Sequence, residues 1–311
     1  MPIPISLADF PRPLLQRVDD NFRKLQKQRP LKREALLKFK EQSRLFHTYH
    51  SNAIEGNSLT LRETRLVIEQ GITIGGKPLR DHLEAANNAR AFDWIWQAAV
   101  ERRKLDHGFL QELHEMVMRG TSPDAGRYRT QNVAIVGASH APPPPAKVLP
   151  MLDQLFRELS EPVHPIIRAV YAHHRLVYVH PFSDGNGRVS RLVSNLLLMN
   201  EKYPRIVLPV EARGRYYASL KAADGGNYGP LSGFVLKAVD EALVWYLAAV
   251  DPGRRLVPLG ELAKGTSYSQ EYLSLRARQG ALEAIKVGRS WHSSRQALQE
   301  YARRLRGSRK L

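Results

Sequence analysis

The stretch that decides the fold is H-P-F-S-D-G-N-G-R-V-S-R, residues 180 to 191. It holds one imidazole, one carboxylate, an asparagine between two glycines, and two arginines three positions apart. Glycine permits tight turns in which backbone N–H groups face an anion, and arginine forks match phosphate oxygens. A helical pattern begins at Val189, so the loop stands at a helix N-terminus, where anions bind well. The stretch therefore predicts a phosphate-binding loop.

Helical patterns flank this loop on both sides. Residues 166–178 are predicted to form an apolar-faced helix with Pro165 in its first turn, and residues 106–119 are predicted to form another. His114 lies on or near the apolar face of the second helix, so we expect it to be a core histidine with satisfied nitrogens. Phe182 is expected to anchor the loop by packing and to have no chemical role. The loop is thus predicted to lie between rigid supports.

Two further helical signals lie upstream. Thr60 followed by Glu63 is a capping box, which predicts a helix that ends at Gly71. Ser51 and Glu55 stand four positions apart, so they share one face of a helix. Taken alone, this second pattern indicates ordinary helix-end chemistry.

A short β-branched run lies between the helices of the middle region. Val133, Ala134, Ile135 and Val136 are bounded by turn residues, which predicts a strand, and the prolines at 142–145 must be extended. Together they predict a β-hairpin within an otherwise helical domain. Its exposed edge would either dock an extended peptide by strand addition or serve as a structural flap.

The loop resembles the motif of the Fic (Fido) family, H-x-F-x-[D/E]-G-N-G-R-x-x-R, at each defined position. The matching residues are His180, Phe182, Asp184, Gly185, Asn186, Gly187, Arg188 and Arg191. Residues 126–129, G-R-Y-R, resemble the family's lead-in to its flap, and residues 51–56, S-N-A-I-E-G, resemble its inhibitory helix. The resemblance covers roughly residues 45 to 245 and is similar to the class with an N-terminal inhibitor (class II). It implies a mainly α fold: a Fic-type helical core with a β-hairpin flap.

The resemblance implies an enzyme, a protein adenylyltransferase that transfers AMP from ATP to a Ser, Thr or Tyr hydroxyl (AMPylation). The target would be another protein or the chain itself. His180 would take the hydroxyl proton, a task suited to its near-neutral pKa, and Asp184 would hold Mg²⁺. The amides of residues 185–187 would cradle the developing charge. Arg188 would grip the inner phosphates and Arg191 the γ-phosphate.

This assignment changes the reading of Glu55. A carboxylate paired with Arg191 would remove the partner of the γ-phosphate and leave ATP in a pose unsuited to in-line attack. With Ser51 on the same face, Glu55 is therefore expected to hold the chain in an autoinhibited state. The same glutamate could instead position a water that removes AMP from a modified protein, and the sequence leaves both roles open.

The adenine site implied by the resemblance lies downstream. Tyr216, Tyr217 and Asp224 stand in a segment that resembles the family's adenine-lining region. Tyr217 would stack on the base, although a core position explains this residue almost as well. Asp224 departs from the asparagine that relatives often carry there.

The positive charge of the chain is concentrated near its C-terminal end. The 311 residues include 47 Lys and Arg and 30 Asp and Glu, a net charge of +17. Residues 254–311 contribute 13 basic and 4 acidic side chains, a net of +9. Helical patterns at 259–264, 269–279 and 294–305, with a hairpin pattern at 284–292, are similar to a winged helix-turn-helix domain. The charge favours DNA binding, but such modules also dock proteins or form dimers.

We therefore expect three regions: 1–100, a helical region with the inhibitory helix around 45–57; 101–250, the Fic catalytic domain; and 251–311, the winged helix-turn-helix domain. No apolar run reaches the ~18 residues of a membrane span, and the first ten residues lack the plan of a signal peptide. The absence of cysteine fits a reducing cytoplasm. The expected protein is cytoplasmic, without membrane contact, and the resemblance implies a homodimer.

Two other functions remain open at this stage. One is a DNA-binding regulator whose Fic domain senses a nucleotide, and the other is a Fic-type transferase of another nucleotide or of a phosphate group. A retained His180 favours catalysis over sensing, and the pair of arginines favours AMP transfer. A metal hydrolase is poorly supported, because His180 and Asp184 lack further ligands at metal spacing.

Overall fold

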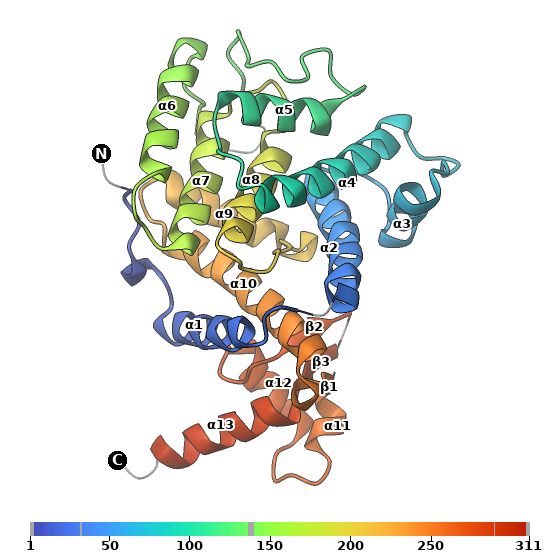
Figure 1. Ribbon diagram of the computed structural model, residues 1–311, viewed down its shortest axis with the longest axis vertical. Coiled ribbons are helices and arrows are strands. Elements are labelled where there is room, and N and C mark those ends of the chain that lie inside the picture. Colours follow the sequence, from blue (N-terminus) through green and yellow to red (C-terminus); the bar gives the residue numbers. More distant parts are fainter. Residues whose placement is uncertain (1–2, 32, 136–139, 289, 309–311) are drawn as a thin grey trace. The chain divides into compact units, whose positions relative to one another are not determined.

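The structure is a computed structural model that describes residues 3–31, 33–135, 140–288 and 290–308. Helices dominate the described residues, which confirms the predicted mainly α class. The chain forms two compact units (Figure 1). The first comprises Met1–Pro11 and Lys40–Ala238, and the second comprises Arg12–Phe39 and Val239–Leu311.

The first unit is a helical bundle built around α8. Its helices are the later part of α2 (Arg33–Ile54), α3 (Leu61–Gln70), α4 (Leu79–Val100), α5 (His107–Met118), α6 (Val148–Leu159), α7 (Pro165–Val179), α8 (Asn186–Asn200), α9 (Arg213–Asp224) and the first part of α10 (Gly229–Val250). Helices α7, α4 and α5 pack against α8, and Figure 1 shows α7 and α8 side by side in the middle of the unit. Every residue of α8 from Arg188 to Leu198 is buried. The phosphate-loop motif therefore opens the most enclosed helix of the bundle.

The ends of α3 follow the sequence closely. The Thr60 side chain accepts the Glu63 amide at 3.2 Å, and the Glu63 carboxylate accepts the Thr60 amide at 2.7 Å. Gly71 closes the helix with φ of 68°, a left-handed conformation that glycine adopts without strain. The predicted capping box and helix stop are confirmed.

The predicted β-hairpin flap is wrong for the described residues. Val133, Ala134 and Ile135 belong to no strand, and Val136 lies outside the described residues. A β-branched run favours extended backbone, but a strand also requires a neighbouring strand to complete its hydrogen-bond ladder. None of the described residues supplies that neighbour, so Val133, Ala134 and Ile135 lie in a loop.

The second unit joins the C-terminal elements to the first helix of the chain. Its elements are α1 (Arg12–Lys27), the first part of α2, the last part of α10, β1 (Val257–Pro258), α11 (Leu259–Ala263), α12 (Gln270–Arg278), β2 (Ile285–Val287), β3 (Ser290–Ser293) and α13 (Arg295–Ser308). The helices and hairpin expected after residue 258 are present. Strand β3 lies between β1 and β2 and is antiparallel to both, and β1 was not predicted. Leu273 is fully buried at the centre of the apolar core of these elements.

Helix α1 is tied to this unit by buried polar contacts. Asn21 donates to Glu283 at 2.7 Å, and Arg17 pairs with Asp240 at 2.6 Å. Glu283 also pairs with the buried Arg254 at 2.8 Å. Burial raises the pKa of Glu283, although Arg254 and Asn21 oppose the shift. Since removal of one partner from a buried ion pair is strongly destabilising, α1 is an integral part of the second unit.

Buried neutral histidines make the first unit sensitive to acid. Burial lowers the pKa of His47 and His173 to about 3 and that of His114 to about 4. In the unfolded chain these imidazoles take up protons below about pH 6.5. Their stabilising effect is therefore complete above pH 6.5 and is lost as the pH falls toward 4, about 2 kcal/mol per histidine at pH 5.

We expect the free energy of unfolding to fall steeply between pH 7 and pH 5 in urea titrations followed by circular dichroism. His173→Gln should be less stable at both pH values, because it loses the contacts to Ser194 and Tyr216. The difference between the two pH values should nevertheless shrink by about 2 kcal/mol. A His173→Gln protein with the wild-type difference would show that this histidine is not the acid-sensitive group.

Candidate active site

The loop between α7 and α8 begins at a strained residue. His180 caps the C-terminus of α7 in the left-handed conformation, with φ of 50° and ψ of 59°. This region is uncommon for residues other than glycine and is often found at functional sites. The carbonyl of His180 accepts a hydrogen bond from Arg129 Nε at 2.7 Å. The backbone of His180 is therefore held by Arg129, a residue outside the loop.

The His180 imidazole is arranged as a proton acceptor. Its Nδ1 lies 3.2 Å from the Val177 carbonyl, and a carbonyl accepts only, so Nδ1 carries the proton and Nε2 has a free lone pair. Burial lowers the pKa of His180 below its ordinary value, and the charge of Arg129 lowers it further. The ring is therefore neutral at physiological pH.

Packing and hydrogen bonds fix the middle of the loop. The Asn186 side chain closes a ring with Phe182, accepting from its amide at 3.0 Å and donating to its carbonyl at 2.9 Å. The Phe182 ring is fully buried and stacks on His114 with centroids 3.6 Å apart. The predicted packing role of Phe182 is confirmed. The Asn186 side chain is used within the loop, so only its backbone can face a ligand.

His114 connects this loop to the segment before the flap. The Gly126 amide donates to His114 Nδ1 at 2.9 Å, so Nε2 carries the proton and donates to the Asp184 carbonyl at 3.0 Å. The expectation of a buried, satisfied histidine is confirmed. Sequence reasoning missed that its two contacts join residues 126 and 184, because both partners are backbone groups, which leave no sequence signature.

The N-terminus of α8 is open for an anion. Gly185 precedes it with φ of 78°, and a Cβ there would come within 2.7 Å of Met118 Sδ. The first N–H groups of a helix have no partner within the helix, so the amides that begin at Asn186 carry a partial positive charge. The predicted position of the motif at a helix N-terminus is confirmed.

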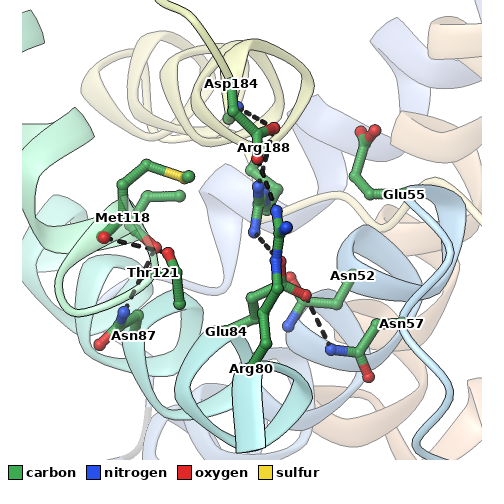
Figure 2. Close-up of polar contacts among 12 residues, drawn as sticks. Asn52, Glu55, Asn57, Arg80, Glu84, Asn87, Met118, Thr121, Asp184 and Arg188 are labelled. Carbon is green, nitrogen blue, oxygen red and sulfur yellow. Dashed lines mark hydrogen bonds and ion pairs between the residues drawn. The ribbon is translucent and has the colours of Figure 1, made fainter. Parts of the chain in front are cut away.

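Asp184 and Arg188 lie together beside this helix end (Figure 2). Arg188 Nη2 lies 3.3 Å from Asp184 Oδ1, and the Gly185 amide donates to the same oxygen at 2.6 Å. Burial alone would raise the pKa of Asp184, but Arg188, the Gly185 amide and Arg80 together hold it below its ordinary value. The side chain is 48% exposed, so the site offers a half-exposed, anionic carboxylate.

Helix α4 supplies polar residues that sequence reasoning missed. Figure 2 shows Glu84 and Arg80 rising from α4 toward Arg188 and Asp184. Glu84 pairs with the buried Arg188 at 3.0 Å and accepts from Asn57 Nδ2 at 3.0 Å. Arg80 Nη2 pairs with Asp184 Oδ2 at 2.7 Å. No local sequence signal identifies these contacts, since Arg80 and Asp184 stand 104 positions apart.

Arg191 is held by Ser51 near the end of α2 and by Glu55 just beyond it; the family resemblance implied the contact with Glu55 but not that with Ser51. Arg191 Nε donates to Ser51 Oγ at 2.8 Å, and Nη2 donates to the Ser51 carbonyl at 2.9 Å and to Glu55 Oε1 at 2.6 Å. The Arg191 side chain is 3% exposed and that of Glu55 is 32% exposed. Burial lowers the pKa of Arg191, but the charges of Glu55 and Tyr216 and the hydrogen bonds to both residues together outweigh burial, so the net shift is upward. The pair is charge-assisted and largely shielded from water.

Gly187 leaves the space that Glu55 fills. A Cβ on Gly187 would collide with Glu55 Oε1 and lie 3.1 Å from Arg191 Nη1. The Glu55 carboxylate therefore lies directly against the first turn of α8. The first N–H groups of α8, which have no partner within the helix, are exposed to a ligand at this turn.

The three residues predicted for the adenine site lie in different environments. Tyr216 is 1% exposed and bonds His173 at 2.8 Å, so its ring is part of the core. Tyr217 is 39% exposed, its hydroxyl donates to the Ile54 carbonyl at 3.4 Å, and the Arg213 guanidinium lies over its ring, 5.2 Å from the ring centroid. The Asp224 carboxylate lies 3.0 Å from His174 Nε2, within the polar contacts between α9 and α7.

Arg129 joins the ends of the flap to the motif loop. Besides the His180 carbonyl, its guanidinium donates to the carbonyls of Gln131 and Pro143, and its amide donates to the Pro181 carbonyl at 3.0 Å. Its side chain is buried. The sequence placed Arg129 only in the lead-in to the flap, because backbone acceptors leave no sequence signature.

Among the described residues, no group of three or more His, Asp and Glu side chains could enclose a metal ion. No helix in the described part of the chain is both long and apolar enough to cross a membrane.

Comparisons with known proteins agree with this geometry. The model of the Fic/DOC family matches residues 104–198. Protein adenylyltransferase Fic of Drosophila persimilis is 34% identical over 230 residues, which cover 72% of this chain and 45% of that protein. The chain thus spans about half the length of the curated relatives it matches.

Solved structures extend the likeness. A fragment of Fic-1 from C. elegans is 33% identical with a TM-score of 0.70, and the match covers 78% of this chain and 73% of the fragment. A Fic family protein from Desulfovibrio desulfuricans G20 has the same fold, with a TM-score of 0.63 over 93% of this chain and 24% identity. This chain therefore belongs to the Fic family.

Proposed function

We propose that this protein transfers AMP from ATP to a hydroxyl group of a target protein. The observation that carries the proposal is a neutral imidazole, His180 Nε2, with a free lone pair beside an open helix N-terminus. A proton acceptor and an anion site at adjacent positions are the two parts that hydroxyl attack on phosphorus needs. Curated relatives that share 34–36% identity carry the name protein adenylyltransferase.

His180 begins the reaction in this proposal. It accepts the proton from a Ser, Thr or Tyr hydroxyl while that oxygen attacks the α-phosphorus, and pyrophosphate leaves. The contact of Nδ1 with the Val177 carbonyl keeps the acceptor at Nε2. Arg129 donates a hydrogen bond to the His180 carbonyl, so the backbone position from which the imidazole extends is fixed.

The first turn of α8 and two arginines bind the phosphates. The amides of residues 185–187 cradle the charge that develops during transfer. Arg188, oriented by Glu84 and Asp184, takes the inner phosphates. Arg191 takes the γ-phosphate once it is released from Glu55. A planar fork suits both tasks because it can donate two parallel hydrogen bonds to phosphate oxygens.

Asp184 is proposed to hold Mg²⁺, which would neutralise and orient the phosphates. The residue fits the ion: one half-exposed carboxylate is available, and magnesium is commonly held by one or two carboxylates plus substrate phosphates. No further protein ligands are required, since water and phosphate oxygens complete the octahedron.

Glu55 is proposed to inhibit transfer, and Ser51 is proposed to help by accepting two hydrogen bonds from Arg191. The contacts with Arg191 withhold the γ-phosphate ligand, and the carboxylate lies where phosphate charge would approach Gly187. Self-modification is the expected product when this contact is broken. If Glu55 instead positions water, the same site removes AMP from a modified protein.

Substrate contacts follow from the placement of two segments. Tyr217, which is partly exposed, is proposed to stack on the adenine, and Asp224 is proposed to lie near it. The loop that contains Val133, Ala134 and Ile135 is proposed to add a target peptide as a neighbouring strand. The homodimer, the cytoplasmic location and the division at residues 100 and 250 stay predictions.

The experiment that tests the function uses ATP labelled at the α- or the γ-phosphate, with Mg²⁺, in a cell lysate. With the Glu55→Gly protein, target proteins and the protein itself should incorporate the α-label and not the γ-label. Incorporation of the γ-label would indicate phosphoryl transfer instead. Incorporation of label from UTP in preference to ATP would identify another nucleotide as substrate.

A second candidate function is DNA binding by the basic C-terminal region. Arg278 at the end of α12 and Lys286 on β2 are exposed, on the helix and hairpin that face DNA in winged helix-turn-helix proteins. Such a region would place the transferase, or a nucleotide sensor, at a DNA site.

We expect the full-length protein to bind duplex DNA with an affinity that falls about 40-fold between 50 and 200 mM salt, if three phosphates are contacted. Fluorescence anisotropy measures this slope, and Lys286→Ala should reduce it by about one unit. The full chain is needed because α1 contributes to this unit. Absence of binding at 50 mM salt would leave a protein-docking role for the region.

A further inference from the structure

Arg80 forms an ion pair with Oδ2 of Asp184, the carboxylate proposed to bind the metal ion. Its Nη2 lies 2.7 Å from Asp184 Oδ2, and its Nε lies 3.1 Å from Glu84 Oε1. The Arg80 side chain is 56% exposed, so it lies at the rim of the site rather than in the core. Figure 2 shows the guanidinium between the two carboxylates.

The two oxygens of Asp184 have different partners. Oδ1 faces inward, where it accepts from the Gly185 amide and lies near Arg188. These partners belong to the motif loop and its helix. Oδ2 faces Arg80, which comes from the separate helix α4. A cation that binds Asp184 from the solvent side therefore meets Oδ2, and Arg80 is already there.

We propose that Arg80 is a cation placeholder: its guanidinium neutralises Asp184 until a divalent ion, arriving with the nucleotide, displaces it. This proposal rests on the proposed function, since it assumes that Asp184 is the metal ligand. It adds a residue to which the motif assigns no role. It also implies that the concentration of metal required by this site is set partly by a side chain on α4.

Two properties of the Arg80–Asp184 pair make the displacement physically reasonable: the pair is weak, and Arg80 keeps another partner after it breaks. An ion pair between two half-exposed groups is weak, because water screens the charges and side-chain entropy opposes the contact. A dication bound by Asp184 and phosphate oxygens competes with it easily. After displacement, Arg80 keeps its contact with Glu84, which is itself held by Asn57 and Arg188. The guanidinium therefore stays beside the phosphates and does not have to find a new partner.

Removal of the positive charge should make metal binding easier. We expect Arg80→Ala to lower the Mn²⁺ concentration for half-saturation by about three- to tenfold at low ionic strength, because competition and charge repulsion both vanish. Arg80→Lys keeps the charge and should remain within about twofold of wild type. The difference between Arg80→Ala and wild type should shrink at higher salt, because exposed charges are screened.

Water-proton relaxation during Mn²⁺ titration measures this directly, since the signal reports protein-bound metal and requires no turnover. The full-length protein carries Glu55→Gly in every sample, and α,β-methylene-ATP is present so that no AMP can be transferred. Arg90→Ala, an exposed arginine on the same helix, is the matched control and should titrate like its parent. Asp184→Asn defines the signal that belongs to the site.

The outcomes separate the two proposals. A lower Mn²⁺ requirement for Arg80→Ala, with Arg80→Lys and Arg90→Ala unchanged, supports the placeholder. If Asp184→Asn abolishes the enhancement and Arg80→Ala titrates like its parent, the placeholder is overturned and the metal assignment stands. If Asp184→Asn leaves the enhancement intact, Asp184 is not the metal ligand and both are overturned.

Discussion

Glu55→Gly is expected to raise AMP transfer about 10- to 100-fold. The Arg191 guanidinium is buried and donates to Glu55 at 2.6 Å, a charge-assisted contact that must break before Arg191 can hold a phosphate. Such contacts contribute about 1.5–3 kcal/mol, which corresponds to this range of rates. Ser51 keeps two contacts with Arg191, so the guanidinium stays in place while one donor becomes free.

The substitution is structurally mild. Glu55 lies just beyond the last residue of α2, where glycine is well tolerated. Incorporation of α-labelled AMP into target proteins and into the protein itself measures the effect. Glu69→Gly, an exposed carboxylate near the end of α3, is the matched control and should transfer no more than wild type. Equal labelling by Glu55→Gly and wild type would overturn the inhibitory role.

His180→Asn in the Glu55→Gly background is expected to reduce transfer about 100- to 10,000-fold, the usual contribution of a general base. Asparagine is preferable to alanine here, because residue 180 has φ of 50° and asparagine tolerates the left-handed conformation. The loss should therefore report chemistry rather than a distorted loop. Nucleotide affinity, measured by calorimetry, should stay within about threefold, since His180 makes no phosphate contact in the proposed mechanism.

The pH dependence gives an independent check on the same group. Because burial and Arg129 lower the pKa of His180, the free base persists below pH 6.5. Transfer by Glu55→Gly should therefore fall on acidification with a midpoint below the ordinary histidine pKa of about 6.5. A decline that begins above pH 7 would assign the titration to another group. Retained transfer by His180→Asn would exclude His180 as the base.

The sequence predicted the local features of the site because a motif records residues that are close in the chain. The helix N-terminus at residue 186, the packing of Phe182 and the capping box at Thr60 all depend on neighbours within a few positions. The Glu55 contact with Arg191 spans 136 positions. Only family resemblance made that prediction available.

The features that were missed depend on partners without a sequence signature. Arg129 binds backbone carbonyls, and any residue can supply a carbonyl. Arg80 resembles the other exposed arginines of the basic chain, and only the fold brings it to Asp184. The flap was predicted as a strand because β-branched residues favour extended backbone, yet the described residues give it no neighbouring strand. β-Propensity is a property of a single segment, whereas a β-sheet requires two segments that pair.

The polar contacts between α1 and the C-terminal elements have a consequence for biosynthesis. Helix α1 is synthesised well before Asp240 and Glu283, the residues that bind Arg17 and Asn21, because these follow them by 223 and 262 positions. Chains are made from the N-terminus, and domains generally fold as units once they are complete. The first unit can therefore assemble while α1 still lacks its ion-pair partners. Helix α1 therefore reaches its final contacts only after the C-terminal elements have been made.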